Sequence, residues 1–272
     1  MRRLLWPALV LAVAACGKPQ ESAKAPEAPP PEPVAAAAPA PTADNAAIEA
    51  AVASTDRLAS DKEQDSWRQP AEVLKFMELR PGMHVLDYFA AAGYYTELIS
   101  RVVGPDGKVI AYNNAQYRAF SSDGPDKHYG NNRLPNVVEL TTPVEAMPLD
   151  PASLDGALFM QSYHDLYWRS KKDWVETDPA KALQQLSAAL KPGAVVVVVD
   201  HVAKAGGDPT ETVNAMHRID PAIIKRDFEA VGLTFDSESP LFANAADDHS
   251  KEVFDKSIRH KTDQVMYRFR KK

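Results

Sequence analysis

The stretch VLDYFAAAGYYT, residues 85–96, decides the fold. It continues an apolar run that starts at His84, passes through an acid, Asp87, and several small residues, and then enters a helical pattern from Tyr94 to Val103. A buried strand, a tight turn and a helix in this order are the opening of a βαβ unit. Small residues at such a turn let the backbone amides of the helix N-terminus approach a ligand closely. A tight turn without a ligand is the alternative interpretation of this stretch alone.

Strand and helix patterns alternate along the rest of the chain. Strands are expected at 84–89, 108–112, 137–140, 154–161, 194–200, 233–237 and 264–270, and helices at 48–58, 70–77, 94–103, 180–190 and 221–231. The five consecutive valines at 195–199 suit a parallel strand that helices cover on both faces. The alternation predicts an α/β protein with a doubly wound, mostly parallel sheet.

The N-terminus is predicted to be an export signal followed by a tether. Arg2 and Arg3 precede an apolar run, 4–13, that is too short to span a bilayer. The run ends in VAAC, and this resembles the lipobox of bacterial lipoproteins, which implies removal of residues 1–15 and lipidation of Cys16. A buried free cysteine is the alternative. Because Gly17 is not the aspartate linked to inner-membrane retention, we expect an outer-membrane anchor that faces the periplasm.

Composition separates the remaining chain into a tether and a folded domain. Residues 16–45 are rich in Pro and Ala and hold too few large apolar side chains to fold, so they are expected to be disordered. Residues 46–272 form the predicted domain, with 46–80 as an N-terminal helical cap. The net charge of −6 argues against nucleic acid as a partner, and the single cysteine excludes an intramolecular disulfide and a cysteine-rich zinc site. Membrane contact is expected through the lipid only.

Several longer stretches resemble the class I S-adenosylmethionine-dependent methyltransferases, and more narrowly a group of exported bacterial lipoproteins described as predicted methyltransferases. The resemblance extends over about residues 60–272. It rests on PGMHVLDYFAAAGYYTELI, GALFMQSYHDLYW, KPGAVVVVVDHVA, HRIDPAIIKRDFEAVGL, LFANAADDHSKEVFD and IRHKTDQVMYRFRK. It implies a seven-stranded Rossmann-like sheet closed by an antiparallel C-terminal hairpin, and S-adenosylmethionine as the cofactor.

The cofactor-binding residues that the resemblance implies depart in part from the family pattern. Phe89 and Ala91 stand where the family has glycines, and Asn113 stands where an acid usually holds the ribose. Glu145 is a substitute for the acid that meets the adenine amine. The full expected set is Asp87, Phe89, Ala91, Gly93, Tyr94, Asn113, Glu145 and Gln161.

Two His/Asp pairs follow the fourth and fifth expected strands and are the candidates for catalysis. These are His164-Asp165 and Asp200-His201. Imidazole titrates near neutral pH, so either histidine can act as the general base for an incoming nucleophile. The alternative is that each pair only ties down a loop. A metal site built from His164, His201 and His217 lacks a compact ligand spacing, so no metal is expected.

Substrate contacts are expected from Tyr163, Asp200, Arg218 and Asp248. Arg218 is the candidate for an anionic substrate group, whereas the neighbouring Asp220, followed by proline, is interpreted as a helix N-cap. Asp248 lies in a polar loop between the last two strands, which is either a lid over the site or an ordinary solvated loop.

Three functions compete. The leading hypothesis is methyl transfer to an unknown small or envelope-associated acceptor. The second is a non-catalytic periplasmic ligand-binding protein that retains the methyltransferase fold, because the cofactor is made in the cytoplasm and the glycine loop is altered. A hydrolase has less support, since the sequence contains no GxSxG motif.

Overall fold

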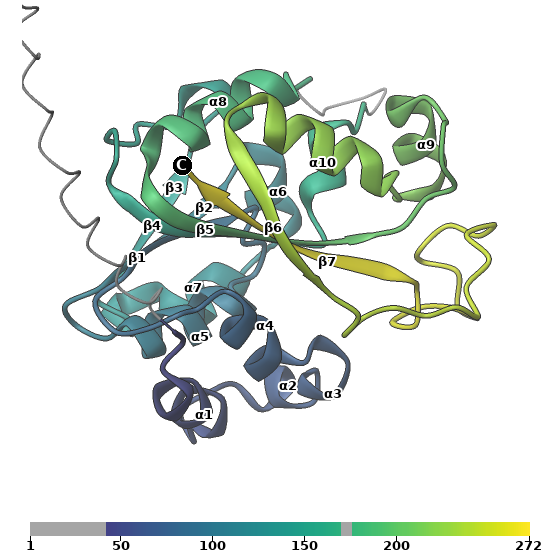
Figure 1. Cartoon of the computed structure of the whole chain (residues 1–272). Coiled ribbons are helices and arrows are strands. Elements are labelled where there is room, and N and C mark those ends of the chain that lie inside the picture. Colours follow the sequence, from purple (N-terminus) through teal and green to yellow (C-terminus); the bar gives the residue numbers. More distant parts are fainter. Residues whose placement is uncertain (1–41, 170–175) are drawn as a thin grey trace, which may run out of the picture. The chain divides into compact units, whose positions relative to one another are not determined.

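The computed structural model describes residues 42–169 and 176–272, so the expected signal, Cys16 and most of the expected tether lie outside the described residues. The described chain forms one seven-stranded sheet with helices on both faces (Figure 1). The strands are β1 (His84–Tyr88), β2 (Lys108–Asn113), β3 (Val137–Thr141), β4 (Leu154–Met160), β5 (Leu190–His201), β6 (Leu233–Ser239) and β7 (Gln264–Lys271).

The strand order is β3-β2-β1-β4-β5-β7-β6. The first five of these pair in parallel, whereas β7 pairs antiparallel with both β5 and β6. This confirms the predicted fold class, including the antiparallel C-terminal pair. The chain leaves β1 toward β2 on one side and returns to β4 on the other, so the carboxyl ends of β1 and β4 flank the point where an open α/β sheet binds its ligand.

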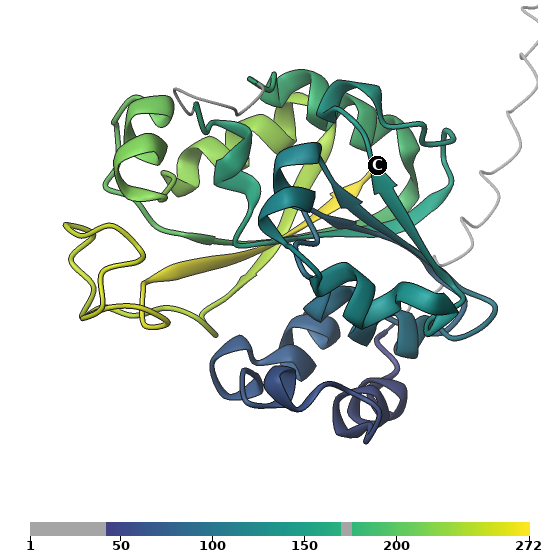
Figure 2. The same cartoon turned by 180° about the vertical axis from the view of Figure 1, so that it is seen from behind.

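Helices form a layer on each face of the sheet, and the two views agree on which helix covers which face (Figures 1 and 2). One layer contains α6, α8, α9 and α10, and the other contains α4, α5 and α7 with α1 to α3 beyond them. The bounds are α1 (Asn45–Ala53), α2 (Ala59–Lys62), α3 (Asp65–Arg68), α4 (Pro70–Phe76), α5 (Tyr94–Val103), α6 (Ala115–Phe120), α7 (Gly124–Tyr129), α8 (Pro179–Ala189), α9 (Pro209–Met216) and α10 (Pro221–Ala230), with 3-10 turns at Gly130–Asn132, Val144–Ala146 and Tyr163–Leu166.

The valine run of β5 shows why both layers form. Successive side chains of a strand point to opposite faces. Val196 and Val198 accordingly belong to the core under α8 and α10, and Val195, Val197 and Val199 belong to the core on the other face with α1, α4 and α5. A polar residue in this run would therefore face a helix layer on either side.

The boundaries differ from the expected ones where local geometry overrides periodicity. Helix α1 ends at Ala53 and not at 58, because Ser54 has an extended backbone (ψ 130°). Strand β5 begins at Leu190 and not at 194, so Lys191-Pro192-Gly193 lies inside the strand. Gly193 has φ 81° there, and the register against β4 shifts at this point. The short helices α2, α3, α6, α7 and α9 were not predicted. Among the described residues, every helix is too short or too polar to cross a membrane.

Candidate functional site

A cavity of about 560 Å³ opens at the carboxyl ends of β1, β4 and β5. Small-molecule sites usually measure about 300–1,000 Å³, so it is large enough for a cofactor. The sequence-predicted residues that line it are Asp87, Phe89, Ala91, Gly93, Tyr94, Gln161, His164, Asp165 and His201. The strand ends therefore bring together the expected catalytic residues and most of the expected cofactor-binding residues.

The loop between β1 and α5 forms one wall of the cavity in a strained conformation. Phe89 (φ 54°) and Ala91 (φ 49°) both adopt the left-handed region that favours glycine, and Gly93 (φ 109°) caps α5. The Phe89 ring stacks on Tyr117, with 4.4 Å between ring centres and an interplanar angle of 6°. The loop thus keeps the backbone path of a glycine loop although two of its residues carry side chains.

Asp87 lies near the end of β1, one residue before Tyr88, and is buried. Its Oδ2 accepts a hydrogen bond of 2.6 Å from the hydroxyl of Thr96 on α5. Burial raises the pKa of Asp87 to about 6, and the Thr96 hydrogen bond only partly opposes this. A nearby cation in the cavity would offset the cost of burying the carboxylate.

Two of the expected cofactor-binding residues do not line the cavity. The side-chain amide of Asn113 accepts from the Ala91 N–H at 2.9 Å and donates to the Ala91 carbonyl at 3.1 Å, so it holds the loop. Glu145 accepts from the backbone N–H of Asp178 at 2.8 Å, next to the start of α8. The structure therefore gives both residues partners in the protein.

His164 lies at the centre of the expected catalytic cluster. Its Nδ1 is 2.7 Å from Asp200 Oδ1, its backbone N–H donates to Asp200 Oδ2 at 2.8 Å, and its Nε2 is 3.6 Å from Asp165 Oδ1. Burial lowers the pKa of His164, but the carboxylates of Asp165 and Asp200 outweigh it and raise the pKa to about 9. His164 consequently carries a proton at neutral pH.

His201, unlike His164, is uncharged at neutral pH. Its Nδ1 is 2.8 Å from the Thr262 hydroxyl, and its ring centre is 6.1 Å from that of His164. Burial lowers the pKa of His201 to about 3 although Asp200 opposes the shift, and the positive charge of His164 adds to the lowering. At neutral pH this imidazole is therefore uncharged and can accept a proton.

An aromatic wall completes the same end of the cavity. His217, which follows α9, lies with its ring centre 4.3 Å from Trp168, 4.9 Å from Phe254 and 5.8 Å from His164. Burial and the charge of His164 lower the pKa of His217 to about 4. This end of the cavity can therefore hold a flat or apolar molecule beside a neutral imidazole.

The expected substrate-binding residues lie behind or away from the cavity. Tyr163 is buried in the core and donates to Asp227 at 2.6 Å, and Asp200 lies beneath His164. Arg218 is fully buried in an ion pair with Asp247 (2.8 Å) and donates to the carbonyls of Val202 and Lys251. Asp248 is exposed and accepts from Ser250.

Several cavity residues were missed from the sequence. The N-terminal helices contribute Asp61, Gln64 and Arg68, and the loop between β6 and β7 contributes Val253 and Phe254. Tyr117 also lines the cavity, and its hydroxyl donates to Asp165. Trp168, His217 and Phe254 stand within the stretches that carry the family resemblance, and this was the available signal. The N-terminal residues carried none, since only the folded chain brings them to the strand ends.

Comparison with known proteins shows the fold. Residues 54–122 match the protein-L-isoaspartate(D-aspartate) O-methyltransferase family. A SAM-dependent methyltransferase from Aquifex aeolicus has 20% identity and a TM-score of 0.53 over 78% of this chain and 96% of that chain. An arsenic(III) S-adenosylmethionine methyltransferase from Chlamydomonas reinhardtii has 17% identity and a TM-score of 0.53 over 83% of this chain and 73% of that chain.

The same fold also carries other chemistry. The [4+2]-cyclase SpnF has 18% identity and a TM-score of 0.50 over 78% of this chain and 81% of that chain. No curated protein sequence matches the chain. The chain therefore has the Rossmann-like fold of the S-adenosylmethionine-dependent methyltransferases, and the reaction has to be argued from the site.

The cavity residues fit S-adenosylmethionine at one end better than at the other. Arg68 and the N-terminus of α5 offer partners for a carboxylate, and Asp87 can accept from an ammonium group. At the ribose side, Asn113 already bonds both backbone groups of Ala91. The cavity residues therefore fit the amino-acid and sulfonium part, whereas Asn113, expected at the ribose, has its partners in the protein.

Proposed function

We propose that the chain transfers a methyl group from S-adenosylmethionine to a small or envelope-associated acceptor. The observation that carries this proposal is a single cavity that joins Asp87 and the loop 89–93 to the histidine cluster after β4 and β5. The match of 54–122 to a methyltransferase family supports it, because this segment contains the loop. When bound, S-adenosylmethionine supplies a methyl group on a positively charged sulfur that a nucleophile can attack.

The charges around the cavity suit such a cofactor. Asp87 and Asp165 both line the cavity, and carboxylates stabilise a cation in a site of low dielectric. Asp165 accepts a hydrogen bond from the Tyr117 hydroxyl and lies beside the protonated His164. This arrangement aligns the methyl group with the acceptor between the Asp87 side and the Asp165 side of the cavity. Such alignment is its main catalytic contribution.

His201 is the proposed general base. His164 already carries a proton, so it cannot accept another, and it serves instead to hold Asp200 and Asp165 in place. His201 is neutral, and its low pKa is sufficient because an acceptor atom becomes strongly acidic as its bond to the methyl group forms. The aromatic wall of Trp168, His217 and Phe254 favours an acceptor with a flat or apolar part.

Label transfer tests this assignment. The full-length chain is incubated with methyl-labelled S-adenosylmethionine and a bacterial envelope fraction, and labelled products are counted. We expect incorporation that falls at least tenfold in His201→Gln and is unchanged in the control His84→Gln, which lies at the start of β1 away from the cavity. Equal incorporation in both variants would exclude His201 as the base.

A non-catalytic ligand-binding protein is the second candidate. It is favoured by the engagement of Asn113 with Ala91 and by the Phe89 ring in the cofactor loop. This candidate predicts no affinity for S-adenosylmethionine, whereas methyl transfer requires it.

We further propose that the protein is exported and attached through lipid on Cys16 to the outer membrane, facing the periplasm. The support is the sequence alone: the basic start, the short apolar run and the VAAC stretch that ends in the single cysteine. A source of S-adenosylmethionine outside the cytoplasm is then required.

A further inference from the structure

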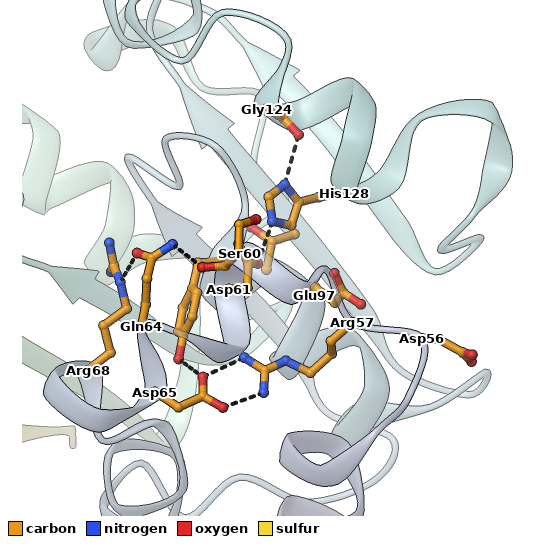
Figure 3. A network of polar contacts seen from close by, with 12 residues as sticks. Asp56, Arg57, Ser60, Asp61, Gln64, Asp65, Arg68, Glu97, Gly124 and His128 are labelled. Carbon is orange, nitrogen blue, oxygen red and sulfur yellow. Dashed lines mark hydrogen bonds and ion pairs between the residues drawn. The ribbon is translucent and has the colours of Figure 1, made fainter.

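A second cluster of ligand-type side chains lies at the edge of the cavity, where α2, α5 and α7 meet (Figure 3). Asp61 comes from α2, Glu97 from α5 and His128 from α7, and all three are buried. One ligand atom of each lies within 4.8 Å of those of the other two. We propose that these three side chains bind a divalent transition-metal ion, with Zn²⁺ as the first candidate. No metal was expected from the sequence.

Glu97 supplies the observation that points to a cation. Its Oε1 accepts from Nη2 of Arg101 and Nη2 of Arg133, each at 2.7 Å. Its Oε2 is buried and has no hydrogen-bond partner among the described residues. A buried carboxylate oxygen without a partner costs free energy and calls for an explanation. The two arginines fix the carboxylate through one oxygen and leave the other available to a metal ion.

His128 is oriented as metal-binding histidines are. Its Nδ1 donates to the Gly124 carbonyl at 2.8 Å, and its Nε2 lies 2.7 Å from Asp61 Oδ2 (Figure 3). A backbone carbonyl on one ring nitrogen sets the tautomer and leaves the other nitrogen for the metal. One imidazole and two carboxylates form a donor set that Zn²⁺ accepts in tetrahedral sites, with water as a fourth ligand.

The exchange is balanced in protons and charge. In the metal-free protein a proton lies between His128 Nε2 and Asp61 Oδ2. The incoming ion takes its place and the proton passes to solvent, so binding releases about one proton and involves no change of oxidation state. Asp61 and Glu97 oppose the charge of the dication, and Arg101 and Arg133 share the charge of Glu97.

The position of the cluster indicates what the metal would do. Asp61 and His128 line the cavity, which gives the ion a path of entry. A Cβ at Gly93 would lie 3.1 Å from the Cβ of His128, so the cluster sits directly against the cofactor loop. A bound ion would tie the N-terminal helices to α5 and α7 and stabilise the wall of the cavity.

Calorimetric titration of ZnCl₂ into the full-length, metal-stripped chain, purified without a histidine tag, tests the proposal. We expect one site with a micromolar or lower Kd and release of about one proton, measured by repeating the titration in buffers of different ionisation enthalpy. Glu97→Gln and His128→Gln should each weaken binding at least tenfold. The matched control His249→Gln breaks a comparable pair, His249 with Asp263 (2.9 Å), and should change Kd less than twofold.

A measurement on the unaltered chain guards against variants that fail to fold. Co²⁺ added to the wild-type protein should give visible absorption bands that one equivalent of Zn²⁺ removes. Absence of saturable Zn²⁺ binding, or wild-type affinity in folded Glu97→Gln and His128→Gln proteins, would overturn the proposal. Binding that His249→Gln weakens equally would place the ion elsewhere and would overturn it as well.

Discussion

Phe89 and Ala91 show how single residues shape the loop 89–93, between β1 and α5. A left-handed conformation costs an ordinary residue about 1–2 kcal/mol relative to the right-handed helix region. Phe89 offsets this cost by burying its ring against Tyr117 and Tyr112. Ala91 has no such contact and is held through its backbone by Asn113. Phe89 and Ala91 therefore both hold a left-handed backbone conformation at the edge of the cavity.

Relief of the strain at Ala91 is the first testable consequence. Ala91→Gly should raise the free energy of unfolding by about 0.5–1 kcal/mol, because the gain in the left-handed region exceeds the entropy cost of glycine. Urea denaturation measures this change. Ala152→Gly is the matched control, since Ala152 has φ 47° in a turn before β4 and should gain as much. A gain at Ala152 without one at Ala91 would show that the loop stores no strain there.

The histidine charges predict a pH dependence of stability. The pKa of His164 is about 9 in the fold and about 6.5 unfolded, so its contribution is complete below pH 6.5 and is lost as pH rises toward 9. The pKa of His201 is about 3, so its contribution is complete above pH 6.5 and is lost as pH falls toward 3. His164 therefore lowers the stability as the pH rises above 6.5, and His201 lowers it as the pH falls below 6.5.

Variants separate these two effects. In urea titrations, the loss of stability in His164→Gln should be larger at pH 6 than at pH 9.5 by about 1–3 kcal/mol, given 1.36 kcal/mol per pKa unit and incomplete realisation in a buried pair. In His201→Gln, the free energy of unfolding should instead fall less than in the wild type as the pH is lowered from 6.5 toward 3. The same loss at both pH values in His164→Gln would contradict the assigned charge of His164.

The positions of these residues could be predicted, whereas their charges could not. Asp87, His164 and His201 follow strands, and strand ends meet in an open α/β sheet. The pKa of His164 depends on its burial and on the carboxylates of Asp165 and Asp200, and Asp200 comes from another strand. Asn113 was expected at the ribose, and its pairing with Ala91 depends on the path of the strained loop.

At the scale of elements, the start of α5 is the point where the loop, the cavity and α7 meet. Gly93 caps α5 with φ 109°, and a Cβ there would lie 2.9 Å from Tyr129 Cε1 and 3.1 Å from His128 Cβ. Such distances force a neighbouring side chain to move. The glycine is therefore required both for its backbone conformation and for the approach of α7.

Gly93→Ala should accordingly be more harmful than an equivalent change elsewhere. Gly232→Ala is the matched control, because Gly232 has φ 81° and nothing within 4 Å of an added Cβ. Thermal or urea denaturation should show a loss of about 1 kcal/mol for Gly232→Ala from backbone strain and about 1–3 kcal/mol more for Gly93→Ala from overpacking. Equal losses of stability in the two variants would mean that α7 can move away from a Cβ at residue 93 without a cost in free energy.

Long elements followed from periodicity, and short ones did not. Helix α5 and helix α10 lie within a residue of the expected ranges, since each has several turns of apolar spacing. Helices α2 and α3 have four residues each and are defined by tertiary contacts, such as that of Asp61 Oδ2 with His128 Nε2 at 2.7 Å. They contribute Asp61 and Arg68 to the site, so this part of the cavity could not be predicted from sequence patterns.

At the scale of the whole molecule, the sheet topology followed from the alternation of strands and helices together with the family resemblance.

The proposed anchoring concerns residues outside the described part and has its own test. Cys16→Ser should move the protein from the membrane fraction to the soluble fraction and abolish acylation detected by mass spectrometry. Retention in the membrane fraction would show that the chain is held there by something other than lipid on Cys16.

The central claim, that the cavity binds S-adenosylmethionine, is tested most directly by calorimetric titration. S-adenosylmethionine and S-adenosylhomocysteine are titrated into the full-length chain and into Asp87→Asn, each first shown to be folded. The account predicts one saturable micromolar site for both compounds, weakened at least tenfold in Asp87→Asn, because Asp87, near the carboxyl end of β1, is a buried acid that lines this cavity. No binding by the folded wild-type chain would contradict it and favour a non-catalytic ligand-binding protein with the methyltransferase fold.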